Sequence, residues 1–197
     1  LIAEMGANTV RMAHYQHDDA WSDEADKAGM IAWAEAPYVT TPSLTGGQGS
    51  PALWANAEQQ LRELIRQNYN HPSIVMWSIG NETDAAVGFG VGKEPPKSLP
   101  LLQHLQKVAK EEDPNRPTVF ADCCENISMM RTSGEKLAGT ADLMGYNRYF
   151  GWYYPQPLKA REQLGAQLDK FHVKHPALPI SVSEYGAGGA ISQHSDN

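Results

Sequence analysis

Residues 73–82 read Ser-Ile-Val-Met-Trp-Ser-Ile-Gly-Asn-Glu, an apolar run that ends abruptly in an amide and a carboxylate. A short and nearly continuous apolar run predicts a strand that is buried on both faces, as in a parallel sheet. Five other stretches have the same form and are predicted as strands: 8–13, 30–36, 117–121, 142–146 and 179–183. The sequence therefore predicts six strands, of which 73–80 is the third.

The segments between these strands have the spacing of helices. Asp18 or Asp19 can cap a helix that runs to Lys27, and the segments 52–70, 99–112 and 158–175 repeat apolar residues at helical intervals. A shorter helix is expected within 122–140, and long loops within 41–51 and 87–100. Strand and helix alternate without a shift in composition, which predicts an α/β fold in one domain over 1–197.

Composition excludes several classes of partner. The 197 residues carry a net charge of −7 and no run of Lys or Arg, which disfavours nucleic acid. The apolar runs are too short to cross a membrane, so we expect no membrane association. No signal peptide is evident, but the chain does not begin with Met, so the cell location stays open. The adjacent Cys123 and Cys124 are expected to be buried free thiols, because a bond between neighbours closes almost no loop.

Polar side chains follow the predicted strands, at the point where each strand ends. These are Arg11 and His14, Glu35, Asn81 and Glu82, Asp122, Asn147 to Tyr149, and Glu184. In a β/α barrel the carboxyl ends of the strands carry the active-site groups. Retaining cleavage of a glycosidic bond needs two carboxylic groups, one to donate a proton and one to attack the sugar. Glu82 and Glu184 fit this pair, although a lone Glu is more often a solvated loop residue.

Other chemistries have weaker support in the sequence. The glycines at 186–189 lack dinucleotide spacing, and no Gly-x-Ser-x-Gly elbow, His-x-x-x-His or His-x-His pattern occurs. A metal-dependent barrel hydrolase would need His and Asp clusters at the strand ends, where only His14 is found. Aromatic side chains that could stack on sugar rings are Trp77, Tyr149, Trp152, Tyr153 and Tyr154.

Four motifs in order resemble the catalytic domain of glycoside hydrolase family 2, which includes β-galactosidases, β-glucuronidases and β-mannosidases. Residues 70–82 resemble its acid/base segment and residues 182–187 its nucleophile segment. Residues 8–15 resemble an early strand with an Arg and a His-Tyr pair, and residues 147–153 resemble the segment whose Tyr contacts the nucleophile. The resemblance implies a (β/α)8 TIM barrel, present here as about strands 2 to 7. β-sandwich domains would flank it in a longer parent, oligomers are possible, and the isolated piece would be weakly active or inactive.

The resemblance also implies roles for single residues. Glu82 would be the general acid/base, with a raised pKa, and Glu184 the nucleophile. The implied substrate-binding residues are Arg11, His14, Asn81, Asn147, Tyr149 and Trp152. No cofactor is implied with certainty, but a Mg²⁺ or Na⁺ ion is possible in the full enzyme, and Glu35 could contribute to its site.

The resemblance implies an exo-acting retaining β-glycosidase that acts on a carbohydrate substrate, and a bacterial cytoplasm or periplasm as its location. Residues 183–194 are most similar to the β-galactosidase type, and the Asn-x-Lys motif of β-glucuronidases is not seen, so β-galactosidase is the first expectation. The alternatives are β-glucuronidase, β-mannosidase, or a degenerate barrel that only binds carbohydrate. A degenerate barrel would be expected to lack one of the two carboxylates.

Overall fold

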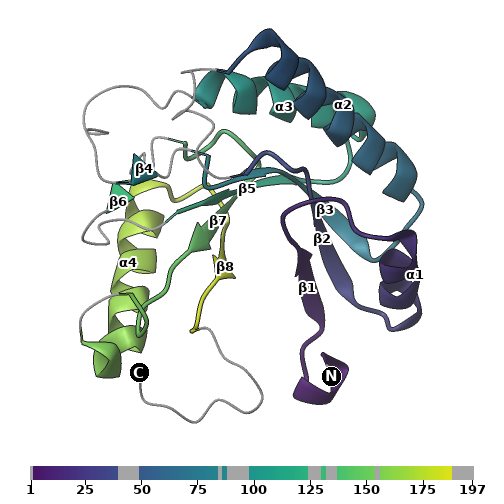
Figure 1. The fold of residues 1–197 in the computed structure, drawn as a ribbon. Helices are drawn as coiled ribbons and strands as arrows, with labels where there is room; N and C mark the ends of the chain where they lie inside the picture. The colour runs from purple at the N-terminus through teal and green to yellow at the C-terminus, as the bar shows by residue number, and fades with distance from the viewer. Residues whose placement is uncertain are drawn as a thin grey trace.

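A six-stranded parallel sheet forms the centre of the molecule. The computed structural model describes residues 2–39, 49–83, 86–87, 98–123, 130–131, 137–153 and 156–187. The strands are β1 (Thr9–Met12), β2 (Ile31–Glu35), β3 (Ile74–Asn81), β5 (Thr118–Asp122), β7 (Leu143–Asn147) and β8 (Ile180–Glu184), paired in that order. All six predicted strands are confirmed, and each end differs from its predicted position by one residue. The sheet curves into an open arch, half of a TIM barrel (Figure 1).

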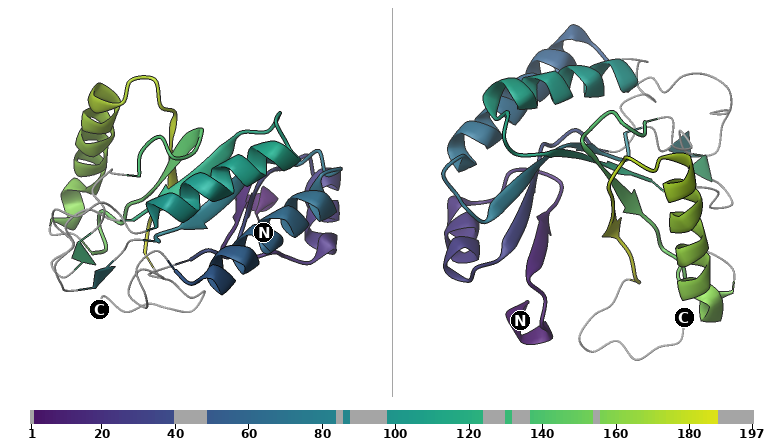
Figure 2. Two further views of the ribbon diagram at one scale, coloured as in Figure 1. Left: turned by 90° about the horizontal axis from the view of Figure 1, so that it is seen from above. Right: turned by 180° about the vertical axis from the view of Figure 1, so that it is seen from behind.

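Four helices lie along the convex side of this arch, as the two views in Figure 2 show. They are α1 (Asp19–Lys27), α2 (Pro51–Asn68), α3 (Leu99–Glu112) and α4 (Ala160–Lys174). Asp18 caps α1 and Ser50 caps α2, each through a side-chain oxygen that accepts a backbone N–H. Short 3-10 helices at Ala3–Met5 and Pro157–Lys159 complete the described helical elements. The four predicted long helices are thus confirmed, and none of the helices in the described ranges is long and apolar enough to cross a membrane.

One pair of short strands was not predicted. β4 (Ala86–Val87) and β6 (Met130–Arg131) pair in antiparallel fashion as a second small sheet. The short helix expected within 122–140 falls mostly outside the described residues, and the part at 130–131 is strand rather than helix. The two expected long loops also lie largely outside the described residues.

The main core lies between the sheet and helices α2 and α3. Ile79 and Trp77 on β3 pack with leucines of both helices, and all of these side chains are inaccessible to solvent. Trp77 also donates its indole N–H to Asp113 Oδ2 at 3.0 Å. The expectation that Trp77 stacks on a sugar ring is therefore wrong. Side chains alternate along a strand, and because the neighbouring Ser78 faces the concave side, Trp77 faces the helices.

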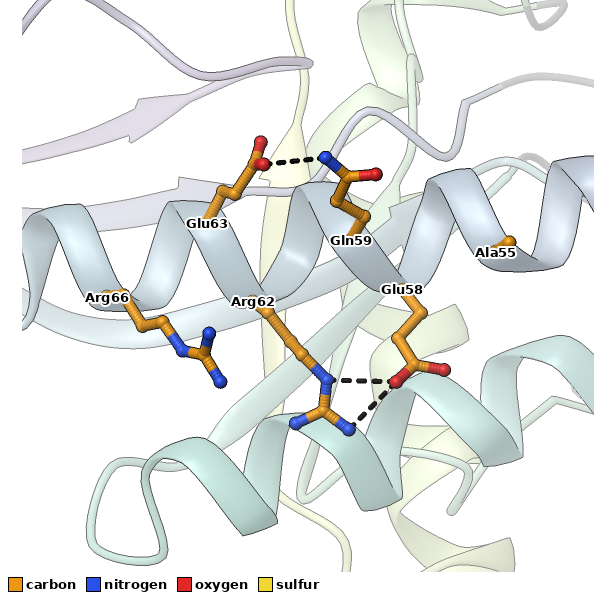
Figure 3. A pocket seen from close by; sticks show the side chains of 6 residues that line it. All are labelled: Ala55, Glu58, Gln59, Arg62, Glu63 and Arg66. Atoms are coloured by element: carbon orange, nitrogen blue, oxygen red, sulfur yellow. Dashed lines mark hydrogen bonds and ion pairs between the residues drawn. The ribbon is translucent and has the colours of Figure 1, made fainter.

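Ion pairs join the outer surfaces of α2 and α3. Arg62 and Arg66 both contact Glu112, with N to O distances of 2.6 Å. Figure 3 shows the shallow pocket on α2 beside them, with Arg62 turned toward Glu58 of the preceding turn. This charged surface belongs to the helix layer, so it stabilises the arch rather than contributing to the strand ends.

Candidate active site

Glu184, the last residue of β8, is held by two donors. Arg11 Nη1 donates to Glu184 Oε1 at 2.5 Å, and the Tyr149 hydroxyl donates to Glu184 Oε2. Arg11 comes from β1 and Tyr149 from the segment after β7, so three strand ends meet at this carboxylate. Hydrogen bonds between charged partners are short and strong, and these two leave the carboxylate in a fixed position. Burial, followed by the hydrogen bond to Glu184, raises the pKa of Tyr149 well above its usual value, which keeps the phenol a donor.

Glu82 follows β3 directly and is partly buried. Its backbone has φ of 50°, in the left-handed region that non-glycine residues rarely adopt. Asn147 Nδ2 donates to Glu82 Oε1 at 2.7 Å. Burial raises the pKa of Glu82, and the charge of Glu184 raises it further, whereas the hydrogen bond from Asn147 opposes the rise. The expected raised pKa of Glu82 is therefore present, and a group of this kind can hold a proton for a leaving oxygen.

Asn81 connects the surroundings of the two carboxylates. Its Oδ1 accepts from Arg11 Nη2 at 2.8 Å and from Asn147 Nδ2 at 3.0 Å. A continuous chain of contacts thus runs from Glu82 through Asn147, Asn81 and Arg11 to Glu184. These five residues come from four strands, and the structure brings all of them to one edge of the sheet.

Two irregularities in the sheet lie beside this edge. The β3 to β5 register shifts between Ser78 and Asn81, and the β7 to β8 register shifts between Tyr146 and Asn147. Ser78 and Asn81 are three positions apart, yet both contact the network on the concave side. Regular alternation would place them on opposite faces, so the bulge turns Asn81 inward.

Trp152 lies at the outer end of a row of aromatic rings. Tyr149 and Tyr153 meet edge to face at 5.3 Å between ring centres, and Tyr153 and Trp152 do so at 5.7 Å. Trp152 is 43% exposed, so a face of the indole is open to solvent. The backbone N–H of Trp152 also donates to the carbonyl oxygen of Tyr149 at 3.0 Å, so Trp152 joins the network through Tyr149 and Tyr153. Tyr154 lies outside the described residues.

Glu35 contributes more to the site than the sequence indicated. It is inaccessible to solvent, and it accepts hydrogen bonds from Arg11, His14 and Ser78. The sequence marked Glu35 only by its position at the end of a predicted strand, and it gave no sign that Ser78 belongs to the site. Ser183, whose hydroxyl donates to Asn147 Oδ1 at 2.6 Å, was also missed.

Glu35 does not fit the suggested role as a ligand of Mg²⁺ or Na⁺. Both of its oxygens already accept hydrogen bonds, and a guanidinium lies against one of them. A cation beside Arg11 would meet like charge, which is unfavourable at short range. In the described ranges no group of three or more His, Cys, Asp or Glu is arranged to hold a metal ion.

The expectation of a free thiol is wrong for Cys123, which is buried at the end of β5 and disulfide-bonded. The prediction rested on loop length, which governs how much a disulfide stabilises the fold and not whether one can form.

Comparison with known proteins agrees with this arrangement of strand ends. Residues 1–194 match the family described as glycosyl hydrolases family 2, TIM barrel domain. A β-glucuronidase of Bacteroides fragilis is 38% identical over an aligned length of 199 positions, which covers 100% of this chain and 26% of that protein. Bacteroides uniformis β-glucuronidase 2, solved covalently bound to cyclophellitol-6-carboxylate aziridine, is 38% identical with a TM-score of 0.76, over 96% of this chain and 22% of that one.

A putative β-galactosidase from Bacteroides fragilis is also similar, with 32% identity and a TM-score of 0.77 over 99% of this chain and 25% of that one. The chain therefore spans only about a quarter of the length of these relatives. The match of the family across nearly every residue is decisive: the chain belongs to glycosyl hydrolase family 2 and carries its TIM barrel domain.

Proposed function

We propose that the protein is a retaining, exo-acting β-glycosidase in which Glu82 is the general acid/base and Glu184 the nucleophile. The observation that carries this proposal is the asymmetry between the two carboxylic groups. Burial raises the pKa of Glu82, which favours its protonated form, whereas Glu184 receives a guanidinium and a phenol on its two oxygens. Different surroundings for two carboxylic groups are what divides the roles of acid and nucleophile.

The reaction would proceed in two displacements. In the first, a Glu184 oxygen bonds to the anomeric carbon while the bond to the leaving oxygen breaks, and Glu82 gives that oxygen its proton. In the second, the Glu82 carboxylate takes a proton from water as the water oxygen attacks the anomeric carbon and the bond to Glu184 breaks. The enzyme ends with Glu82 protonated and Glu184 ionised, as it began. Asn81 would hold a sugar hydroxyl, His14 would line the sugar subsite, and the open face of Trp152 would stack on the substrate.

The sugar we propose is a β-glucuronide, in place of the β-galactoside expected from the sequence. Two of the three similar proteins described above are β-glucuronidases, and one of them forms a covalent complex with a 6-carboxylate compound. The expectation of a β-galactoside rested on the similarity of residues 183–194 to the β-galactosidase type and on the absence of an Asn-x-Lys motif. That absence carries little weight in a chain that spans about a quarter of its relatives. A β-galactoside is the second candidate, because one similar structure is described as a putative β-galactosidase.

The test compares 4-nitrophenyl β-glycosides of glucuronic acid, galactose and mannose on the natural full-length protein. We expect the glucuronide to have the highest kcat/KM, and Glu184→Gln to abolish turnover of every substrate that is cleaved. Faster cleavage of the galactoside would favour the second candidate, and retained turnover in Glu184→Gln would remove the nucleophile assignment. Assay of the 197-residue chain alongside it tests the separate prediction that this domain alone is weakly active or inactive.

A further inference from the structure

Glu35 holds two of the groups that approach Glu184. Its Oε2 accepts from Arg11 Nε at 3.1 Å and from Arg11 Nη2 at 2.7 Å, and its Oε1 accepts from His14 Nδ1 at 2.7 Å. The third donor, the Ser78 hydroxyl, reaches Oε2 at 2.9 Å. Both oxygens are therefore occupied, and with the side chain inaccessible to solvent no water competes for them.

We propose that Glu35 is a positioning residue that directs Arg11 and His14 at the nucleophile Glu184. This inference rests on the function proposed above. Arg11 and His14 each contact both Glu35 and Glu184, so Glu35 acts on the nucleophile through these two partners.

The geometry of Arg11 supports this role. A guanidinium is planar and its N–H groups point in fixed directions, so fixing one edge fixes the others. Glu35 takes Nε and Nη2, and Nη1 is then aimed at Glu184 Oε1 at 2.5 Å. The guanidinium also lies over the Trp33 ring, with its carbon 4.9 Å from the ring centre, so the plane is supported from β2 as well.

The geometry of His14 supports the same role. A carboxylate can only accept, so the proton of the neutral imidazole must be on Nδ1. Nε2 then faces Glu184 Oε1 at 3.8 Å. The hydrogen bond to Glu35 also raises the pKa of His14, although burial and the charge of Arg11 oppose the rise. Glu35 thus sets the tautomer of the neutral ring, and it also favours the protonated form of the ring beside the nucleophile.

Glu35→Gln tests this proposal. The amide has nearly the same shape as the carboxylate, but one of the two oxygens that accept from Arg11 and His14 becomes an NH₂ group, which donates. The first measurement is the rate at which 2-deoxy-2-fluoroglucuronosyl fluoride attaches to Glu184 in the full-length protein, followed by mass spectrometry. Fluoride leaves without a proton from Glu82, so this rate reports on the nucleophile alone. We expect it to fall by about 10- to 100-fold, the effect of losing one hydrogen bond to a charged group.

The second measurement is the pH titration of the His14 ring by NMR, which reports directly on the contact between Glu35 and the ring. We expect its midpoint to fall in Glu35→Gln, because the hydrogen bond that raises it is lost. The matched control is Asp113→Asn, another buried carboxylate, which pairs with Trp77 on the helix side. It should change neither the labelling rate of the folded protein nor the titration of His14.

A wild-type labelling rate or an unshifted His14 midpoint in Glu35→Gln would overturn the proposal. If that variant does not fold, Glu35→Asp replaces it, since the shorter carboxylate cannot reach both partners. Labelling of Glu35→Asp should then be slower than that of wild type, and an equal rate would likewise overturn the proposal. Glu184→Gln separates the two ideas: if it still turns over substrate, the proposed function fails, whereas an inactive Glu184→Gln beside a normal Glu35→Gln removes only the positioning role.

Discussion

Replacing Arg11 by Met removes the main cation that faces the buried Glu35 carboxylate. Breaking a buried ion pair by deleting one partner costs about 3–5 kcal/mol, because the remaining charge is left unpaired in a poor solvent. Loss of the cation over Trp33 adds about 0.5–2 kcal/mol. His14 and Ser78 still contact Glu35, so we expect a total near the lower end, about 3–4 kcal/mol. The free energy of unfolding of a typical domain is about 5–15 kcal/mol, so the loss expected for Arg11→Met is a large share of the total.

The double variant Arg11→Met with Glu35→Leu gives the sharper test. It removes the Glu35 charge together with its partner Arg11. Replacing a buried ion pair by apolar groups of similar volume often changes the free energy of unfolding very little. We therefore expect the double variant to be more stable than Arg11→Met alone, although it carries more changes. The control is Lys27→Met, which removes an exposed ion pair with Glu24 and should leave the urea concentration at half unfolding unchanged.

The assay is unfolding in urea followed by tryptophan fluorescence, with the slope of the free energy against urea compared between variants to confirm that the same unit unfolds. Two results would refute the reasoning. One is a loss of less than about 1 kcal/mol in Arg11→Met, which is the value for an exposed pair. The other is a double variant that is no more stable than the single one.

Three other perturbations test the site. Asn147→Leu should move the alkaline limb of the pH profile of kcat/KM to higher pH, because the hydrogen bond that opposes the raised pKa of Glu82 is lost and the acid keeps its proton longer; a downward move would contradict this. Tyr149→Phe should lower kcat about 10- to 100-fold in steady-state assays with no loss of fold by circular dichroism, since a bond to a charged group is worth about 1.5–3 kcal/mol. Gly145→Ala should lower unfolding stability in urea by about 1–3 kcal/mol, because a Cβ there would lie 2.9 Å from the Trp33 ring, and wild-type stability would show that the ring has room to move.

The strands and their polar ends were predictable, because apolar runs that stop at ionisable residues are visible in the sequence. Glu82 and Glu184 follow such runs, and the fold places both at the carboxyl edge of one sheet. The chain of hydrogen bonds that links Glu82 to Glu184 was not predictable from the spacing of its residues in the sequence. Arg11 and Glu184 are 173 residues apart, and only the order of strands in the curved sheet brings them together.

The face of the sheet on which each side chain lies was predicted less well than the strands themselves. Trp77 was expected to meet a sugar, but strand alternation turns it toward α3 and Asp113. The register shift after Ser78 reverses that alternation for Asn81, and a bulge of this kind leaves no clear mark in the sequence. Glu35 could be placed at a strand end, yet its partners depend on three-dimensional packing that no local pattern reports.

The left-handed backbone at Glu82 has a consequence for how this domain evolves. A residue with a Cβ loses about 1–2 kcal/mol in that conformation, and glycine does not. Selection for stability alone would therefore favour glycine at this position, and the loss of the carboxylate would go unopposed in a lineage that no longer cleaves its substrate. Under the proposed function, glutamate at this strained turn would be maintained by selection for catalysis, against a more stable and inactive sequence that has glycine there.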